Sequence, residues 1–356
     1  MFFYRSINVP RASNLDAPGV FRKNHHVLRR EDSDYFYNIR GILIVLVVLG
    51  HVLEQFYFSS GPARILYKEI YFFHMPMFII MAGYFSSASL RIMPLVQGLI
   101  YPYVVMQIIY AVSDHFLFGS NLLEAMLRPN WGMWFLIAVF VWRVIWPFIH
   151  HLPYLLPIAT LLAVAAGTID EIGGVASRIL VFLPFFVLGC KWSQWGGRAQ
   201  AFEWVRRFGP AVILAGIAAN GMFLWGDYAP AWLYGSLSYA SLGETQWWAG
   251  GIRLLTLAGA GMGICLCLTL APARASWLTR AGKGSMTIYL VHFLVIDLLR
   301  ALHVPAQIGD ALQDHWTIAV VIAPALAVTI AAFLTLPALQ SFCAHITRPP
   351  RRWVKL

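Results

Sequence analysis

Long apolar runs, separated by short polar segments, follow one another along the chain after residue 38. A helix that crosses a bilayer needs about 20 mostly apolar residues. Measured against that length, the pattern predicts ten spanning helices, at residues 39–58, 69–87, 94–116, 132–149, 153–168, 178–193, 209–226, 250–271, 284–302 and 316–340. The third contains Pro102, and the tenth contains Pro324 and Pro337, which neighbouring helices tolerate inside a bundle. We therefore expect an all-α polytopic membrane bundle.

The composition agrees with this expectation. Of the 356 residues, 59% are hydrophobic and only 12% are charged. A soluble domain carries roughly 45–50% apolar and about 25% charged residues. So few charges leave too little polar surface for a molecule of this size in water, and the outer surface is expected to face lipid.

The basic residues indicate how the helices are oriented. With an even number of spans, Lys and Arg gather before the first span, after the last, and in the loops after the second, sixth and eighth. The loops on the other side carry Arg64, Lys68, Arg128 and Arg178 together with Asp170, Glu171, Asp227, Glu244, Asp310 and Asp314. Cytoplasmic loops carry the excess of basic residues, so both termini are expected in the cytoplasm. The net charge of +10 is thereby explained without a nucleic-acid partner.

The sequence is expected to consist of two tails and a transmembrane domain between them. These are a cytoplasmic N-terminal tail at 1–34, a transmembrane domain at 35–342 and a basic cytoplasmic tail at 343–356. The N-terminal residues lack the apolar core and cleavage site of a secretory signal, so the first apolar run is expected to be a permanent span. A bacterial inner (plasma) membrane is the expected location.

Four cysteines, Cys190, Cys265, Cys267 and Cys343, lie in or beside apolar runs and form no C-x-x-C pair. We interpret them as small buried hydrophobes; a metal or disulfide role is the alternative, and no metal site is expected.

The first span carries the strongest chemical signal. Arg40 and His51 are eleven residues apart, so they share one helix face to within roughly 20° and lie about 16 Å apart along the axis. Glu54 follows three residues later on nearly the same face. A histidine beside a carboxylate is a general-base arrangement, because the carboxylate stabilises the imidazolium. The alternative is a histidine that only packs between helices.

Two further histidines lie in spans. His74, beside Pro76, is expected at about the depth of His51, and a structural role at a proline kink is its alternative. His292 lies near mid-membrane, where packing and function remain open. Asp297 and Arg300 follow it at a spacing that allows them to pair.

The longest external connection, at 227–249, is aromatic, with Tyr228, Trp232, Tyr234, Tyr239, Trp247 and Trp248. Such residues are typical of the belt at a membrane interface. A platform for a sugar ring is the alternative.

These residues resemble a known family. Arg40, followed after ten residues by His51, matches the Arg-x10-His motif of the acyltransferase-3 family of membrane acyltransferases. The segment at 73–78, Phe-His-Met-Pro-Met-Phe, with Gly83-Tyr84 is similar to that family's second-helix signature, and Trp134-Phe135-Leu136 and 289–292 are similar to later segments. The likeness covers residues 35 to about 340 and is greatest to the membrane-only, fucose 4-O-acetylase-like members.

The resemblance implies a ten-helix fold, a cytoplasmic acyl-CoA donor and O-acylation of a carbohydrate or lipid-linked glycan at the outer side. His51 and Glu54 are then the expected catalytic pair, and Arg40 supports the donor. Many relatives carry a paired Arg-x-x-Arg after the second helix, where this chain has Arg91 alone. The expected donor-binding set is therefore Arg40 and Arg91, with Arg143 and Lys283 as replacements for the missing arginine. The expected substrate-binding residues are His74, Glu69, His292 and Trp134.

The sequence thus predicts an acyl-CoA-dependent O-acyltransferase that moves an acyl group, by default acetyl, and holds no permanent cofactor. Acyl-CoA, the glycan acceptor and membrane lipids are its expected partners, and its oligomeric state is open. A transporter or flippase with a His/Glu relay is the alternative, because intramembrane ionisable groups also serve proton relays. A structural subunit of a polysaccharide synthase is a third possibility.

Overall fold

The computed structural model describes residues 30–349 except 131, 170–173, 196–197 and 313–314, and within that part the chain is helical with no strand. Its first half consists of α1 (Arg30–Glu54), α2 (Gly61–Tyr84), α3 (Ile92–Leu95), η2 (Val96–Ile100), α4 (Tyr101–Phe118), α5 (Leu122–Leu127), α6 (Trp134–Ile149), α7 (Leu155–Ala165) and η3 (Ala166–Thr168). The second half consists of α8 (Gly174–Val181), α9 (Leu183–Trp195), α10 (Arg198–Trp225), α11 (Ala231–Tyr234), η4 (Ala240–Leu242), α12 (Ala249–Leu270), α13 (Trp277–Lys283), α14 (Ser285–Ala301), α15 (Val304–Ala311), α16 (His315–Thr317), η5 (Ile318–Ile322), α17 (Ala323–Leu334) and α18 (Pro337–Ile346).

The all-α polytopic class is confirmed. Six stretches of the described chain are long and apolar enough to cross a membrane: Ser33–Glu54, Gly61–Tyr84, Ile92–Phe118, Ala201–Trp225, Ala249–Leu270 and His315–Leu334. Two bent pairs raise the number to as many as eight: α8 with α9, bent by 41°, and α13 with α14, bent by 82°. The remaining predicted spans correspond to α6 and α7, which are apolar but shorter. Every predicted span is thus a helix or a bent pair, whereas the count of ten crossings stays a prediction.

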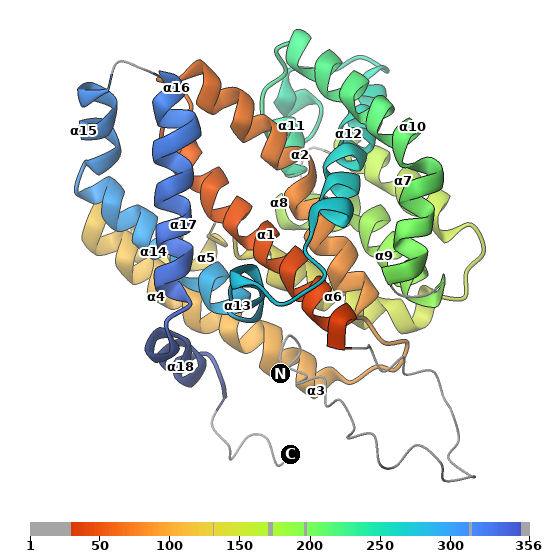
Figure 1. Ribbon diagram of the computed structural model, residues 1–356, viewed down its shortest axis with the longest axis horizontal. Helices are drawn as coiled ribbons and strands as arrows, with labels where there is room; N and C mark the ends of the chain where they lie inside the picture. Colours follow the sequence, from red (N-terminus) through yellow and green to blue (C-terminus); the bar gives the residue numbers. More distant parts are fainter. Residues whose placement is uncertain (1–29, 131, 170–173, 196–197, 313–314, 350–356) are drawn as a thin grey trace.

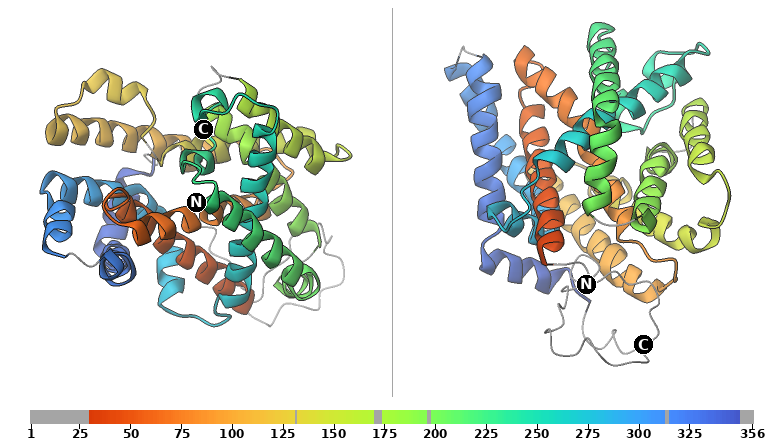
Figure 2. Two further views of the ribbon diagram at one scale, coloured as in Figure 1. Left: turned by 90° about the horizontal axis from the view of Figure 1, so that it is seen from above. Right: turned by 45° about the vertical axis from the view of Figure 1, so that its right-hand side comes forward.

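Helix α1 lies at the centre of the bundle. It contacts α2, α13, α14 and α17, and it lies between α17 on one side and α10 and α12 on the other (Figures 1 and 2). Its apolar window is 72% buried, against 28% for Ile92–Phe118 and for Ala201–Trp225, whose outer faces are left for lipid. Among the six long spans of the described chain, the helix with the His-Glu pair is therefore the most buried.

Several boundaries differ from the predicted ones. Helix α2 begins at Gly61 rather than Glu69, because the Ser60 hydroxyl caps its first turn by accepting from the Ala63 amide and Pro62 follows at the first helical positions. Arg64 therefore lies in a helix and not in a loop. At the other end of the chain, the last span ends at Leu334, and Pro337 begins the separate helix α18.

Two prolines inside spans are accommodated by wider helical turns. The π-helical segments η2 and η5 lie immediately before Pro102 and Pro324. A proline ring collides with the carbonyl four residues earlier and lacks an amide hydrogen, and a π turn changes the local spacing there.

The bent pair α13–α14 is held against α1 by a close backbone approach. A Cβ at Gly282 would lie 1.9 Å from the Tyr37 carbonyl oxygen, and one at Gly41 would lie 2.1 Å from that of Leu278. Asn38, fully buried, donates to the carbonyls of Pro272 and Arg274 and accepts from the hydroxyls of Ser276 and Thr279. This side chain satisfies the irregular backbone before α13.

The start of the first described helix and the whole of the last one lie at the same end of the molecule (Figure 1). The start of α1 and helix α18 lie at the lower end of Figure 1, and the starts of α2 and α16 lie at the upper end. An even number of crossings requires this arrangement. The cytoplasmic assignment of that end, and the division into tails and membrane domain, stay predictions, and residues 1–29 and 350–356 of the tails lie outside the described residues.

Candidate active site

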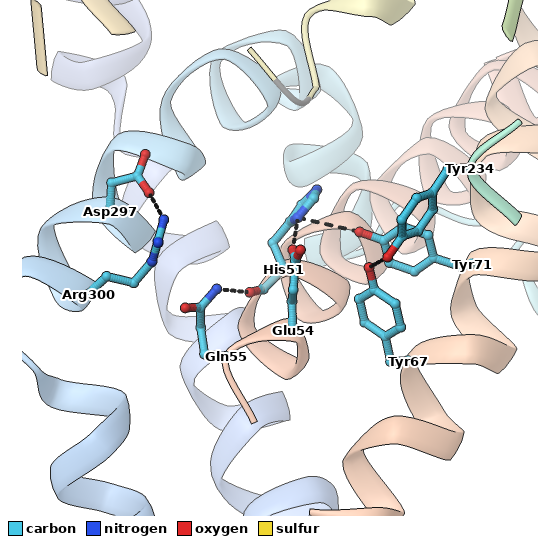
Figure 3. A network of polar contacts seen from close by, with 8 residues as sticks. All are labelled: His51, Glu54, Gln55, Tyr67, Tyr71, Tyr234, Asp297 and Arg300. Carbon is cyan, nitrogen blue, oxygen red and sulfur yellow. Dashed lines mark hydrogen bonds and ion pairs between the residues drawn. The ribbon is translucent and has the colours of Figure 1, made fainter. Parts of the chain in front are cut away.

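The last turn of α1 carries the predicted catalytic pair. The Nδ1 atom of His51 lies 3.1 Å from Oε2 of Glu54 and 3.4 Å from the hydroxyl of Tyr71 (Figure 3). The side chains of His51 and Glu54 are 14% and 33% exposed. A carboxylate accepts hydrogen bonds only, so its contact favours the tautomer with the proton on Nδ1 and leaves Nε2 unprotonated. His51 thus has the arrangement of a base.

A cluster of tyrosines lies beside the pair. The ring of Tyr71 stacks on that of Tyr67 with centroids 4.1 Å apart, and the hydroxyls of Tyr67 and Tyr234 are 2.6 Å apart. Figure 3 shows the three tyrosines on one side of His51 and the ion pair of Asp297 and Arg300 on the other. Burial raises the pKa of Tyr234 to about 12, so this residue of the 227–249 connection stays a neutral phenol.

A cavity connects His51 with the Arg40 end of α1. Its lining includes His51, Tyr71 and Tyr234 as well as Ile44 and Ser285. The Ser285 hydroxyl accepts a hydrogen bond of 2.6 Å from the guanidinium of Arg40. Because Ser285 borders the cavity, the space inside the bundle extends from the hydrogen-bond partner of Arg40 to the imidazole.

Lys283, the second predicted donor-binding cation of this region, lies near Arg40. Arg40, 6% exposed, lies with its guanidinium carbon 5.6 Å from the centre of the Tyr37 ring, and the ammonium of the exposed Lys283 lies 5.4 Å from the same ring. The bend between α13 and α14 brings Lys283 and Ser285 to α1. The structure therefore brings Arg40 and Lys283 together.

His74, His292 and Trp134 all lie near the pair. His74 and Trp134 line the cavity, and the imidazole of His292 lies 5.5 Å from that of His51, centre to centre. Both histidines are buried, and each uses Nδ1 to donate to carbonyls of its own helix. Their tautomer is therefore set by backbone, in contrast to that of His51.

Three other predicted residues lie elsewhere. The carboxylate of Glu69 accepts a hydrogen bond of 2.9 Å from Asn220 and does not line the cavity. Arg143 donates to the Ala82 carbonyl and the Ser86 hydroxyl, and so binds the C-terminal end of α2. Arg91 is exposed just before α3. None of the three borders the space around His51.

The predicted pairing of Asp297 and Arg300 is present, with Oδ1 and Nη1 3.0 Å apart. The four cysteines are free and buried, as expected of small hydrophobes. Within the described residues, no group of three His, Cys, Asp or Glu side chains is arranged to hold a metal ion.

The aromatic connection at 227–249 has no single role. Tyr234 lines the cavity, while Trp232 and Tyr239 are buried and stack on each other with centroids 5.6 Å apart. Trp247 and Trp248 are 89% and 46% exposed, as expected of residues at a membrane interface. Leu233 and Tyr234 thus belong to the site, whereas Trp232 and Tyr239 support the fold and Trp247 and Trp248 are exposed.

Some cavity residues were missed by the sequence analysis. Tyr67 and Tyr71 precede the predicted His74 at spacings of four and three, so a common helix face was readable. Arg178 was counted among external loop charges, although it opens an apolar run, where an arginine is a functional signal. For Ser285 the sequence offered no signal, because the bend before α14 determines where it points. Tyr289 lies in the segment 289–292 that resembles the family, but it was given no role.

Comparison with known proteins identifies the family. The family model described as "Acyltransferase domain" matches residues 34–336. A nodulation protein, NolL, of Mesorhizobium japonicum is 29% identical over 212 residues, covering 52% of this chain and 55% of that protein. NolL of Sinorhizobium fredii is 42% identical over 55 residues, 15% of each chain. The chain thus matches about half the length of one of these relatives and less of the other. No solved structure matches significantly.

A bundle of apolar helices with a partly buried His-Glu pair, whose histidine lines an internal cavity, has the architecture of an integral membrane protein with a candidate site for group transfer. The family model matches most of the length of this chain, and the chain therefore belongs to the acyltransferase-3 family of membrane acyltransferases. It is therefore a multi-pass membrane acyltransferase.

Proposed function

We propose that this acyltransferase moves an acyl group, by default acetyl, from cytoplasmic acyl-CoA to a hydroxyl of a carbohydrate or lipid-linked glycan at the outer side of a bacterial inner membrane. The observation that carries the proposal is the single cavity bordered both by His51 and by Ser285, the partner of Arg40. His51 borders this cavity and Arg40 adjoins it through Ser285, an arrangement that suits a long donor with an anionic head.

The donor side rests on Arg40 and Lys283. The phosphates of CoA need cationic partners, and these two side chains share the ring of Tyr37 in the first half of α1. The pantetheine arm then lies along the cavity. The rise of α1 sets Arg40 and His51 about 16 Å apart, a distance that this arm can bridge.

The chemical step assigns the base role to His51. Its Nε2 takes the proton of the acceptor hydroxyl while the hydroxyl oxygen bonds to the thioester carbonyl carbon. The carbon–sulfur bond then breaks, and the imidazolium returns the proton to the leaving thiolate, so an ester and free CoA thiol are formed. Glu54 stabilises the imidazolium between the two proton transfers. Transient transfer of the acyl group to His51 is the alternative route to the same products.

Donor dependence tests the proposal. Purified protein in liposomes with acetyl-CoA is expected to release CoA thiol when a glycan extract from a deletion strain is supplied, and to release none without it. The extract should gain the acyl mass when analysed by mass spectrometry. Movement of glycan across the bilayer without thiol release would favour the transporter, and acylation in the deletion strain itself would assign the activity to another protein.

A further inference from the structure

Arg178 lies in the same cavity as His51 and is not paired with a described carboxylate. It belongs to α8, the outer half of the bent α8–α9 pair, one turn before the bend. Its Nε donates a hydrogen bond of 3.1 Å to the Tyr234 carbonyl, and its guanidinium carbon lies 5.1 Å from the centre of the Trp134 ring. Among the described residues these contacts hold the guanidinium in place and leave its terminal nitrogens without an anionic partner.

The other arginines of the bundle interior have different surroundings. Arg40 donates to Ser285, Arg143 binds the end of α2, and Arg253, 1% exposed, donates to the Trp232 carbonyl. None of them lines the cavity. Within the described chain, Arg178 is the one Lys or Arg side chain that borders the space in front of His51.

Arg178 differs from the other three because its side chain borders open space, where an anionic ligand can reach it, whereas those three are buried by protein. Ionisable groups at membrane depth are costly, and they are retained where they meet a counter-charge or a substrate. The planar guanidinium fork matches the geometry of carboxylate and phosphate, which it binds with two parallel hydrogen bonds. The aromatic ring of Trp134 and the Tyr234 carbonyl fix the fork in orientation before a ligand arrives.

The position of Arg178 assigns it to the acceptor rather than to the donor. A chain of contacts leads from Arg178 through Tyr234 and Tyr71 to His51, with ring centroids of the two tyrosines 5.5 Å apart and those of Tyr71 and His51 6.2 Å apart. These tyrosines lie by the end of α1, whereas Arg40 lies towards its start. A ligand that meets both Arg178 and His51 is therefore larger than an acyl group and reaches the base from the side away from Arg40.

We propose that Arg178 binds a carboxylate or phosphate group of the acceptor, so that the acylated hydroxyl belongs to an anionic glycan unit. The inference rests on the proposed function and narrows its acceptor class. Tyr71 and Tyr234 then flank the sugar ring between the bound anion and His51.

The test uses the full-length protein and the glycan extract of a deletion strain. Mass spectrometry of the product made by the unaltered protein is expected to locate the acyl group on a unit that bears a carboxylate or phosphate. Arg178→Gln is expected to raise KM for that acceptor about tenfold to a hundredfold, the loss of one charge-assisted hydrogen-bond pair, with kcat nearly unchanged. The KM of Arg178→Lys for the acceptor should lie between that of the unaltered protein and that of Arg178→Gln. Arg128→Gln, which removes an exposed charge, should have the KM and kcat of the unaltered protein.

Each other outcome contradicts the inference. An acyl group on a neutral unit would exclude an acceptor anion, and this result needs no variant. A fall in kcat at constant KM in Arg178→Gln would assign the guanidinium to the oxyanion of the transition state. A raised KM for acetyl-CoA would assign it to the donor phosphates. Absence of any acylated product from the unaltered protein would instead contradict the proposed function.

Discussion

The partners of Nδ1 distinguish His51 from the other histidines of the site. In His74 and His292 this atom donates to backbone carbonyls of the same helix. In His51 it faces the carboxylate of Glu54. A carbonyl fixes a tautomer, but a carboxylate also stabilises the positive charge that the ring gains when it takes up a proton. At this scale the sequence was sufficient, because an i,i+3 pair on one helix needs no tertiary information.

Replacing the carboxylate tests this difference. Glu54→Gln keeps a hydrogen-bond acceptor for Nδ1 but removes the charge, so kcat is expected to fall by at least about tenfold, the equivalent of one pKa unit of lost imidazolium stabilisation. KM for the acceptor should change little. Steady-state kinetics of thiol release measure both. Glu124→Gln, at an exposed carboxylate paired with Arg128, is the control and should leave the rate unaltered; an equal rate in the two variants would contradict the role of Glu54.

Asn38 has a structural role that can be tested separately. Asn38→Ala removes four hydrogen bonds to residues 272–279, and a loss of about 2–4 kcal/mol in stability is expected at roughly 1 kcal/mol for each bond. Thermal unfolding in detergent gives the measurement. A midpoint equal to that of the unaltered protein would show that water replaces these bonds.

At the scale of elements, hydropathy located the helices but not their ends or bends. The start of α2 was missed because Arg64 and Lys68 resembled loop charges, although Lys68 is 3% exposed and pairs with Asp227 across 3.5 Å. The 82° bend at Gly284 has no hydropathy signal, since it depends on how closely α13 approaches α1. That bend also directs Ser285 into the cavity.

The close approach of α13 to α1 predicts a sharp difference between two glycines. In Gly282→Ala the new Cβ meets the backbone of Tyr37, which has no rotamer to escape, so the variant should lose stability by about 1–3 kcal/mol or fail to fold. In Gly221→Ala, inside α10 with nothing within 4 Å, the change should be neutral or stabilising by up to about 1 kcal/mol. Thermal unfolding compares them, and equal midpoints would contradict the described packing.

For the whole molecule, composition was enough to predict a membrane bundle, because a chain with 12% charged residues lacks the polar surface for water. Composition did not predict which residues come together at the site. Tyr234 comes from the connection before α12 and Arg178 from α8, and only the packing of distant segments brings them to α1.

Topology is testable at the same scale. Single cysteines introduced by Ser89→Cys and Trp247→Cys, both at exposed positions, are expected on opposite sides of the membrane, the first in the cytoplasm. A membrane-impermeant maleimide applied to whole cells should label only the second. The native cysteines are buried, which limits background labelling. Labelling of both positions from outside would contradict the even count.

The central claim is that His51 is the base of acyl transfer, and acceptor-dependent release of CoA thiol by His51→Ala tests it most directly. The account predicts that kcat falls by about a hundredfold or more while thermal unfolding stays close to that of the unaltered protein. His151→Ala, at an exposed histidine outside the cavity, should retain full activity. A folded His51→Ala protein that releases thiol and acylates the glycan at the normal rate would contradict the account.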